Sequence, residues 1–393
     1  MSQALRYLRA RYIPERSRGG GTIARSEHHP DGLIHHNPRL AYRGYTLFSG
    51  DEDKAFLIDM KGDVVHQWQS ERGISNPELL SNGNLICLGK PDPINAGQRG
   101  LNGQASCCVE LDWDGNIVWS YEDPWMHHDY ERLPNGNTLL VKWETLPPRL
   151  IRKIKGGYQH EKDDPKKMLG DAVLEVSPEG KIMRKWNSWE HLDPSTEIIG
   201  ALDHRMEWTH CNSISYTPKG NWLLSFRRIS LVCEVNPKTG KIVWKWGDGT
   251  TAHQHDAKYS SKKTITLFDN GVHRKQNLDY SRVIEIDAKS KKILWEYADD
   301  PPFSFYSYFG GSVDYLPNGN YLICETAKGQ IFEVTRDKKV VWEYISPFYY
   351  GNSRLGGRMN ATFRAHRYGP DFPGLQGKDL DPKRYGNLNR LLK

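Results

Sequence analysis

Histidines recur at the starts of three neighbouring segments in the middle of the chain. His128 lies in MHHDYERLPNGN, His210 in WTHCNSISY and His255 in HQHDAKYSSKK. When the segments are aligned on the turns that follow them, His128 and His255 take the same place, and Asn212 takes it in the middle segment. His210 precedes Asn212 by two residues, so both side chains lie on one face of an extended strand. Three imidazoles that converge in this way could take up and deliver protons in catalysis.

The same three histidines could instead hold a divalent metal. Three neutral imidazoles with an open fourth position form a catalytic site for zinc, and manganese is a further candidate. The spacing does not decide between the two chemistries, because ligands drawn from separate segments obey no local spacing rule. A structural role also stays open, in which each histidine ties two neighbouring units together through a hydrogen bond to the backbone.

Arginines and aromatic residues near these segments complete the candidate site. The arginines could neutralise an anionic substrate, and the aromatic side chains could stack against a ring, although aromatics in a repeated scaffold also pack between its units. We predict catalytic roles for His128, His210, His255, Arg274 and Arg227. We predict substrate contacts for Trp208, Asn212, Arg228, Tyr306, Tyr308 and His366.

A recurring hairpin must position these side chains. Six segments read as a strand, a turn and a second strand that ends in tryptophan, and their tryptophans lie 47 to 67 residues apart, at positions 68, 119, 186, 244, 295 and 342. Alternating apolar residues around D-G, E-G or T-G turns are typical of β-hairpins. A second strand pair, usually joined by an N-G-N turn, precedes most of the hairpins. Four antiparallel strands in each unit and a period near fifty residues predict propeller blades.

One of the six units lacks its own inner strand pair. We expect MNATFRAHRYG, which contains His366, and RGYTLFSG to supply it from opposite ends of the chain. The fold class is therefore predicted to be all-β, a six-bladed β-propeller closed by pairing of N- and C-terminal strands. We divide the chain into an N-terminal arm (1–43), the propeller (44–370) and a C-terminal tail (371–393). The inner strands surround the axis, so the three histidines should meet at one mouth of the channel.

Composition limits the partners. The formal charge of +6 is spread over 54 basic and 48 acidic residues, and no dense basic block interleaved with aromatics indicates nucleic-acid binding. The six cysteines show no C-x-x-C spacing and read as reduced thiols. No apolar stretch reads as a secretory signal or a membrane span, so we expect a cytoplasmic protein that does not bind a membrane. The expected partner is a small aromatic or anionic substrate, and the arm could support a homo-oligomer.

Four motifs between Trp208 and Arg274 resemble the arylsulfotransferase family. They are W-T-H-C-N-S-I-S-Y with L-L-S-F-R-R, V-W-K-W-G, H-Q-H-D-A and F-D-N-G-V-H-R, in that order, and the similarity covers most of residues 44 to 370. The resemblance implies a six-bladed propeller that moves a sulfuryl group between phenols through a sulfohistidine, with no nucleotide cofactor. It matches His210 to the W-x-H-x-N-S motif, His255 to the Q-H motif and Arg274 to the arginine after F-D-N-G.

The resemblance also implies a sulfuryl-accepting histidine in the next blade, after the W-E-Y strand. The chain has no histidine between His273 and His366, and the alignment of C-E-T-A-K-G-Q-I-F-E places Gln330 there. An amide cannot serve as that nucleophile. Three hypotheses stay open: an arylsulfotransferase-like enzyme in which His255 or His128 replaces the missing histidine, a metal-dependent lyase or hydrolase that uses the three histidines, and a propeller that binds without catalysis.

Overall fold

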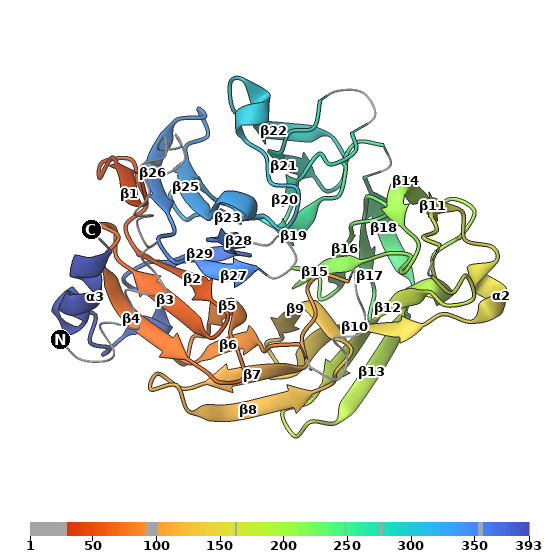
Figure 1. Ribbon diagram of the computed structural model, residues 1–393, viewed down its shortest axis with the longest axis horizontal. Helices are drawn as coiled ribbons and strands as arrows, with labels where there is room; N and C mark the ends of the chain where they lie inside the picture. Colours follow the sequence, from red (N-terminus) through yellow and green to blue (C-terminus); the bar gives the residue numbers. More distant parts are fainter. Residues whose placement is uncertain are drawn as a thin grey trace, which may run out of the picture.

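The alternating strands and glycine turns of the sequence form six antiparallel sheets. In the computed structural model, which describes residues 30–91, 101–161, 163–247, 249–274, 278–352 and 357–392, the sheets stand in a ring around a central axis (Figure 1). The prediction of a six-bladed β-propeller is confirmed. Within each sheet the strand nearest the axis comes first in chain order and the outermost comes last, except where the two ends of the chain meet.

Five blades are continuous in sequence, and we number them in chain order. Blade one contains β5 (Ser75–Leu79), β6 (Leu85–Leu88), β7 (Cys107–Leu111) and β8 (Ile117–Glu122); blade two contains β9 (Met126–Arg132), β10 (Thr138–Thr145), β12 (Leu169–Val176) and β13 (Ile182–Asn187). Blade three contains β15 (Cys211–Tyr216), β16 (Trp222–Phe226), β17 (Leu231–Val235) and β18 (Ile242–Trp246); blade four contains β19 (His255–Tyr259), β20 (Thr264–Asp269), β21 (Arg282–Asp287) and β22 (Ile293–Tyr297). Blade five contains β23 (Ser312–Tyr315), β24 (Tyr321–Glu325), β25 (Gln330–Val334) and β26 (Val340–Ile345).

The sixth blade joins the two ends of the chain. Its inner strand is β29 (Ala365–Tyr368), which pairs antiparallel with β2 (Tyr45–Asp51), and β3 (Lys54–Ile58) and β4 (Val64–Gln69) complete the sheet. Figure 1 shows blue β29 beside red β2. The predicted closure is confirmed: β2 lies between β29 and β3, and β29 forms the inner edge of the sheet.

The recurring tryptophans fasten each blade to the next. Each one lies on the fourth strand of its blade, counted from the axis, and donates its indole N–H, over 2.8 to 3.1 Å, to a backbone carbonyl in the outer turn of the following blade. The six donor and acceptor pairs are Trp68 to Asp112, Trp119 to Pro178, Trp186 to Gly240, Trp244 to Ala288, Trp295 to Arg336 and Trp342 to Met60. The last pair links blade five to blade six, so these bonds run around the whole ring.

The N-G-N turns add a second repeated bond. In blade two, Gly136 adopts a φ of +86°, which a residue with a side chain rarely tolerates, and Asn137 then donates its amide to Glu175 on the third strand over 2.6 Å. The equivalent asparagines of blades one, three and five bond the equivalent glutamates in the same way. Apolar side chains of neighbouring blades pack between the sheets, for example Val141 and Val173 with Phe226.

The described parts of both terminal segments contain secondary structure. Residues Gly32–His36 form β1, which adds a fifth strand to blade five by pairing with β26, while residues 1–29 of the predicted arm lie outside the described residues. The C-terminal segment ends in α3 (Gly386–Leu391), where Asn389 bonds both the N–H and the C=O of Val64. The 3-10 turns η5 (Pro373–Leu375) and η6 (Pro382–Tyr385) precede α3.

The remaining elements decorate the propeller. The two long insertions contain α2 (Pro148–Ile151), β11 (Gly156–Tyr158), η2 (Ser188–Glu190) and β14 (Ile199–His204), and β11 pairs with β14. The hairpin of β27 (Tyr350–Asn352) and β28 (Gly357–Met359) precedes the closing strand, and η3 (Pro302–Ser304) and η4 (Thr326–Lys328) lie in blade-five connections. Among the described residues, no helix is long and apolar enough to cross a bilayer.

Candidate active site

A cavity of about 460 Å³ lies at the end of the axis where the inner strands begin, and His128, His210 and His255 all border it. His128 and His210 are in direct contact, with ring centroids 4.4 Å apart at an interplanar angle of 66°. The three residues are only 3 to 5% exposed. Thus imidazoles from three blades, 45 to 127 residues apart in sequence, share one enclosed space.

His128 is held by a chain of polar groups behind it. Its Nδ1 lies 2.8 Å from Nδ1 of His127, whose Nε2 lies 3.1 Å from the Asp171 carboxylate. Neither Nε2 of His127 nor Oδ1 of Asp171 makes a hydrogen bond among the described residues, so the proton shared by the two Nδ1 atoms can belong to either imidazole. Gly103 leaves room for the ring, since a Cβ there would lie 2.4 Å from Nε2.

His210 forms a pair with a carboxylate. Its Nδ1 lies 2.5 Å from Oε1 of Glu207, a residue that is 1% exposed. Arg228 donates from Nε and Nη2 to the same oxygen over 3.1 and 3.0 Å, and Trp143 donates its indole N–H to Oε2 over 2.9 Å. These contacts fix the carboxylate, so Nδ1 of His210 donates to it and Nε2 is left to accept a proton.

His255 has neutral partners. Its Nδ1 lies 2.7 Å from Oδ1 of Asn270 and 3.0 Å from the carbonyl of His253. The amide nitrogen of Asn270 donates to the carbonyls of Ser307 and Gly310, which assigns Oδ1 as the acceptor. Since both bonds of His255 use Nδ1 as the donor, Nε2 is the nitrogen left for a ligand in the cavity.

All three histidines favour the neutral form. Burial, followed by the neighbouring imidazole of His210, lowers the pKa of His128 well below its usual value. Burial and the charges of Arg227 and Arg228 do the same to the pKa of His210, and burial and Arg227 lower the pKa of His255 to about 3. At neutral pH the cavity therefore presents lone pairs on uncharged imidazoles.

Positive charge comes from two of the three predicted arginines. Arg227 and Arg228 border the cavity, and their Nη1 atoms lie 3.6 and 3.8 Å from Oδ1 of Asp203. Arg274 does not border it: its guanidinium lies 3.2 Å from Asp269 and from the carbonyl of Tyr280, and it covers the Tyr280 ring.

The predicted substrate-contacting residues separate into two groups. Arg228 and Tyr308 border the cavity, and Tyr308 is 44% exposed. The others do not. Trp208 is fully buried with its indole bonded to the carbonyl of Glu197, Tyr306 donates to Asp279, Asn212 donates to the carbonyl of Gln254, and His366 borders a separate cavity further along the axis.

Several residues of the site were missed at the sequence level. Glu207 lies directly before the W-T-H motif and Asn270 within F-D-N-G, so both were visible in the motifs, but nothing local indicated that they orient His210 and His255. Phe363 borders the cavity from the segment that leads into β29. Its place follows from closure of the ring and not from any local pattern.

In blade five, Gln330 does not border the cavity. Gln330 begins β25 and donates its amide to Glu343 over 2.8 Å, away from the cavity. The blade-five residues at the cavity wall include Thr326, whose hydroxyl bonds the N–H of Gly311 and the carbonyl of Phe363. No described histidine of blade five reaches the cavity, so its imidazoles come from blades two, three and four.

The three cavity histidines do not form a compact metal-ligand set. Among the described residues, the one group of three or more His, Cys, Asp or Glu side chains whose ligand atoms all lie within 4.8 Å of one another is Asp203, His253 and His273. None of these three borders the cavity. A metal held by His128, His210 and His255 would require their rings to move.

Comparison with known proteins gives three findings. The arylsulfotransferase (ASST) family model matches residues 24–345. Arylsulfate sulfotransferase AssT of Escherichia coli O6:H1 is 24% identical over 285 residues, which cover 53% of this chain and 46% of that protein. The AssT of Lelliottia amnigena is 22% identical over 362 residues, covering 71% and 58%. The chain thus spans about half the length of the curated relatives it matches.

A similar fold occurs among solved structures. A protein of unknown function from Bacteroides caccae aligns with a TM-score of 0.52 at 14% identity, covering 83% of this chain and 98% of that one. At this identity the likeness concerns the fold alone.

Proposed function

Because the chain belongs to the arylsulfotransferase family, we propose that it transfers a sulfuryl group from an aryl sulfate to a phenol inside the axial cavity. The observation that carries the proposal is the set of neutral imidazoles, with the tautomers of His210 and His255 assigned, beside two arginines in one cavity. A sulfate ester needs positive charge around its oxygens and a nucleophile in line with its sulfur, and this cavity supplies both kinds of group.

The cavity wall suits an aromatic substrate. Besides the histidines and arginines, the wall contains aromatic and apolar side chains: Tyr308, Phe309, Tyr350, Phe363 and Met359. Aromatic side chains stack on a planar ring, and arginines pair with sulfate oxygens, so an aryl sulfate satisfies both parts of the wall. A volume of about 460 Å³ lies within the range of small-molecule pockets.

We assign the nucleophile to His255. Its Nδ1–H is held by an amide and a carbonyl oxygen, which fix the ring without offering it a base, so Nε2 keeps its lone pair for the sulfur. His210 differs because a carboxylate stabilises its imidazolium form, which suits a residue that carries a proton. His255 therefore acts as the sulfuryl acceptor, and His210 with Glu207 acts as the general acid and base.

The two half-reactions balance with these residues alone. In the first, Nε2 of His255 bonds to sulfur, the sulfur–oxygen ester bond breaks, and its electron pair leaves with the phenolate oxygen, with Arg227 stabilising the negative charge. In the second, His210 takes the proton from the acceptor phenol, whose oxygen bonds to sulfur while the nitrogen–sulfur bond returns its pair to His255. His210 delivers that proton to the leaving phenolate in the next cycle.

The test is to trap the intermediate. Incubation with 4-nitrophenyl sulfate without an acceptor should release 4-nitrophenol and leave one sulfuryl group on the peptide that contains His255, which peptide mass spectrometry measures. His255→Asn should lower phenol-dependent transfer at least about 1000-fold, the loss expected when a nucleophile is removed.

His128→Asn is the matched control, since it removes another cavity imidazole. It should retain sulfuryl labelling at His255. Labelling of His128 in the wild-type protein, with none at His255, would reverse the assignment. Absence of both transfer and labelling with a range of aryl sulfates would refute the proposed reaction.

A further inference from the structure

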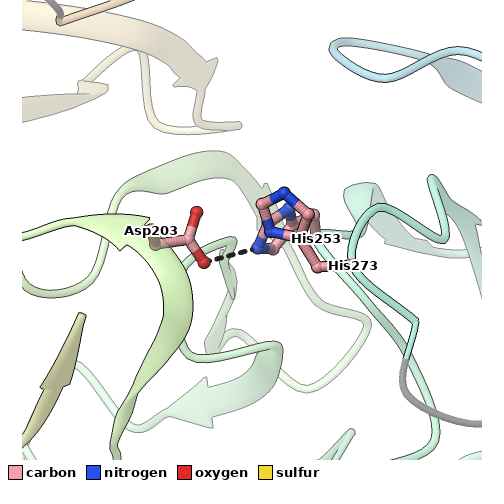
Figure 2. Close-up of side chains that lie close together, drawn as sticks. All are labelled: Asp203, His253 and His273. Atoms are coloured by element: carbon pink, nitrogen blue, oxygen red, sulfur yellow. Dashed lines mark hydrogen bonds and ion pairs between the residues drawn. The ribbon is translucent and has the colours of Figure 1, made fainter. Parts of the chain in front are cut away.

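A second cluster of ionisable side chains lies beside the cavity but outside it. Asp203 belongs to β14 in the second insertion, His253 to the connection between β18 and β19, and His273 to the connection after β20. Figure 2 shows the three side chains together, with Oδ2 of Asp203 2.8 Å from Nε2 of His253. The two imidazoles meet edge to face, with ring centroids 5.2 Å apart.

The cluster has the composition of a metal site. Each residue offers one ligand atom, and these atoms all lie within 4.8 Å of one another. A metal bound about 2.0 to 2.2 Å from each ligand brings such atoms to within about 4.4 Å of one another, so small side-chain rotations suffice. Two imidazoles and a carboxylate suit first-row divalent transition metals such as zinc. Calcium and magnesium prefer sets made of oxygen atoms.

His253 is 4% exposed, and its Nε2 bonds Asp203, while its Nδ1, the other ring nitrogen, has no hydrogen-bond partner among the described residues. A buried polar atom without a partner is uncommon in folded proteins and often marks a place for an ion or a water molecule. His273, in contrast, is exposed, so the cluster is reachable from solvent.

The two carboxylate oxygens of Asp203 face different partners. Its Oδ1 faces Arg227 and Arg228 at 3.6 and 3.8 Å, whereas its Oδ2 faces His253. A cation on the Oδ2 side leaves the arginine contacts in place. The two guanidiniums repel that cation, so they weaken its binding without blocking the position.

We propose that Asp203, His253 and His273 form a binding site for a divalent transition metal, separate from the axial cavity. The metal would link three segments that are far apart in sequence: β14, the entry to blade four and the connection that follows β20. It would also draw the charge of Asp203 away from Arg227, which faces the cavity. The site therefore stabilises the loops that frame the cavity and does not take part in bond breaking.

Zinc binding to the full-length protein tests the proposal. The protein is first treated with a chelator, which is then removed. Equilibrium dialysis against Zn²⁺ should then load about one equivalent of zinc per wild-type chain. The His273→Ala variant should bind Zn²⁺ with a dissociation constant at least ten times higher. Zn²⁺ should raise the melting temperature of the wild-type protein more than that of the variant, because a ligand that binds only the folded state stabilises it. Co²⁺ in place of Zn²⁺ should give visible absorption bands that the same substitution removes.

His35→Ala is the control, because His35 is an exposed histidine on β1, far from the cluster in sequence. It should bind Zn²⁺ as the wild-type protein does. If His273→Ala binds Zn²⁺ as tightly as the wild-type protein, or if neither binds it, the proposal is refuted. These measurements follow metal binding and not sulfuryl transfer, so they succeed or fail independently of the proposed reaction.

Discussion

Two cavities on the axis are lined by the same strands but differ in electrostatics. At the mouth, His128 on β9 and His255 on β19 hydrogen-bond to uncharged groups or to another imidazole, and burial favours their uncharged form. Three residues further along the same strands, Glu131 and Lys258 border a second cavity of about 200 Å³. Their positions in the repeat place both the histidines and the Glu131 and Lys258 side chains on the axis. The groups that surround each side chain decide whether it carries charge.

Charge is paired inside the second cavity. Lys258 lies 2.5 Å from Asp314 and 2.9 Å from Asp256, and Nδ1 of His366 lies 2.9 Å from Asp314. In the wall of the same cavity, the guanidinium of Arg364 donates to both oxygens of Asp129 over 2.9 and 2.8 Å. At the mouth, Arg228 is also held by a carboxylate, that of Glu207 at 3.1 and 3.0 Å, whereas the ion pair of Arg227 with Asp203 is longer, at 3.6 Å.

The difference separates two uses of buried charge. A guanidinium that donates two bonds to a carboxylate is satisfied and holds strands together, whereas one with longer contacts beside a cavity keeps donors for a ligand. We therefore expect substitutions of the paired charges in the second cavity to affect folding, and substitutions at the mouth to affect activity.

Replacing Arg364 should give the largest effect. Arg364→Met leaves Asp129 buried at 1% exposure without its cation, and breaking a buried pair in this way costs about 3 to 5 kcal/mol. Urea denaturation measures the loss. Arg227→Met is the matched change at the mouth and should cost less than about 1 kcal/mol while it lowers sulfuryl transfer. If both variants lose the same stability, the comparison between the second cavity and the mouth is wrong.

Glu207→Gln should have the next largest effect. The amide keeps the size of the side chain but no longer stabilises a protonated His210, so transfer should fall about 100-fold, the order of a general acid and base contribution. The control is Glu131→Gln in the second cavity. Burial, with the charges of Glu78 and Asp129, raises the pKa of Glu131 well above its usual value, so an amide changes little there. Its transfer rate should equal that of the wild-type protein.

We expect the smallest effect on the pH dependence of folding stability, which should change in opposite directions in variants of His366 and His255. Burial disfavours the charged form of His366, but the Asp314 carboxylate outweighs it and raises the pKa of His366. The stability from this pair is complete below about pH 6.5, the unfolded pKa, and is lost as pH rises through the folded pKa. The loss of unfolding free energy in His366→Gln, relative to the wild-type protein, should therefore be largest at acid pH and become smaller as pH rises.

His255 should behave in the opposite way. Its folded pKa of about 3 lies below the unfolded value, so the wild-type protein loses stability as pH falls from about 6.5 toward 3. His255→Asn lacks this loss and should gain relative stability in acid. Chemical denaturation at several pH values measures both variants, and slopes of the same sign would contradict the comparison.

The repeat was readable from the sequence because its signals are local. Alternating apolar residues, glycine turns and a tryptophan at each outer strand define every blade within about fifty residues, and each tryptophan then bonds the next blade in the structure. Closure by β2 and β29 also followed, since one blade lacked two strands. The strand β1 did not follow, because it pairs with β26 about 310 residues away and carries no strong alternation.

The sequence by itself determined which histidines stand at the mouth of the axis, because register along an inner strand follows from its turn. Only the tertiary structure decided what those histidines can do. Asn270 fixes the tautomer of His255, Glu207 pairs with His210, and Asp203 meets His253 from 50 residues away. The tertiary structure also places Arg274 and Gln330 away from the cavity wall, which Thr326 borders. Charge state and hydrogen-bond partners depend on burial and on contacts between blades, and these exist only once the ring has closed.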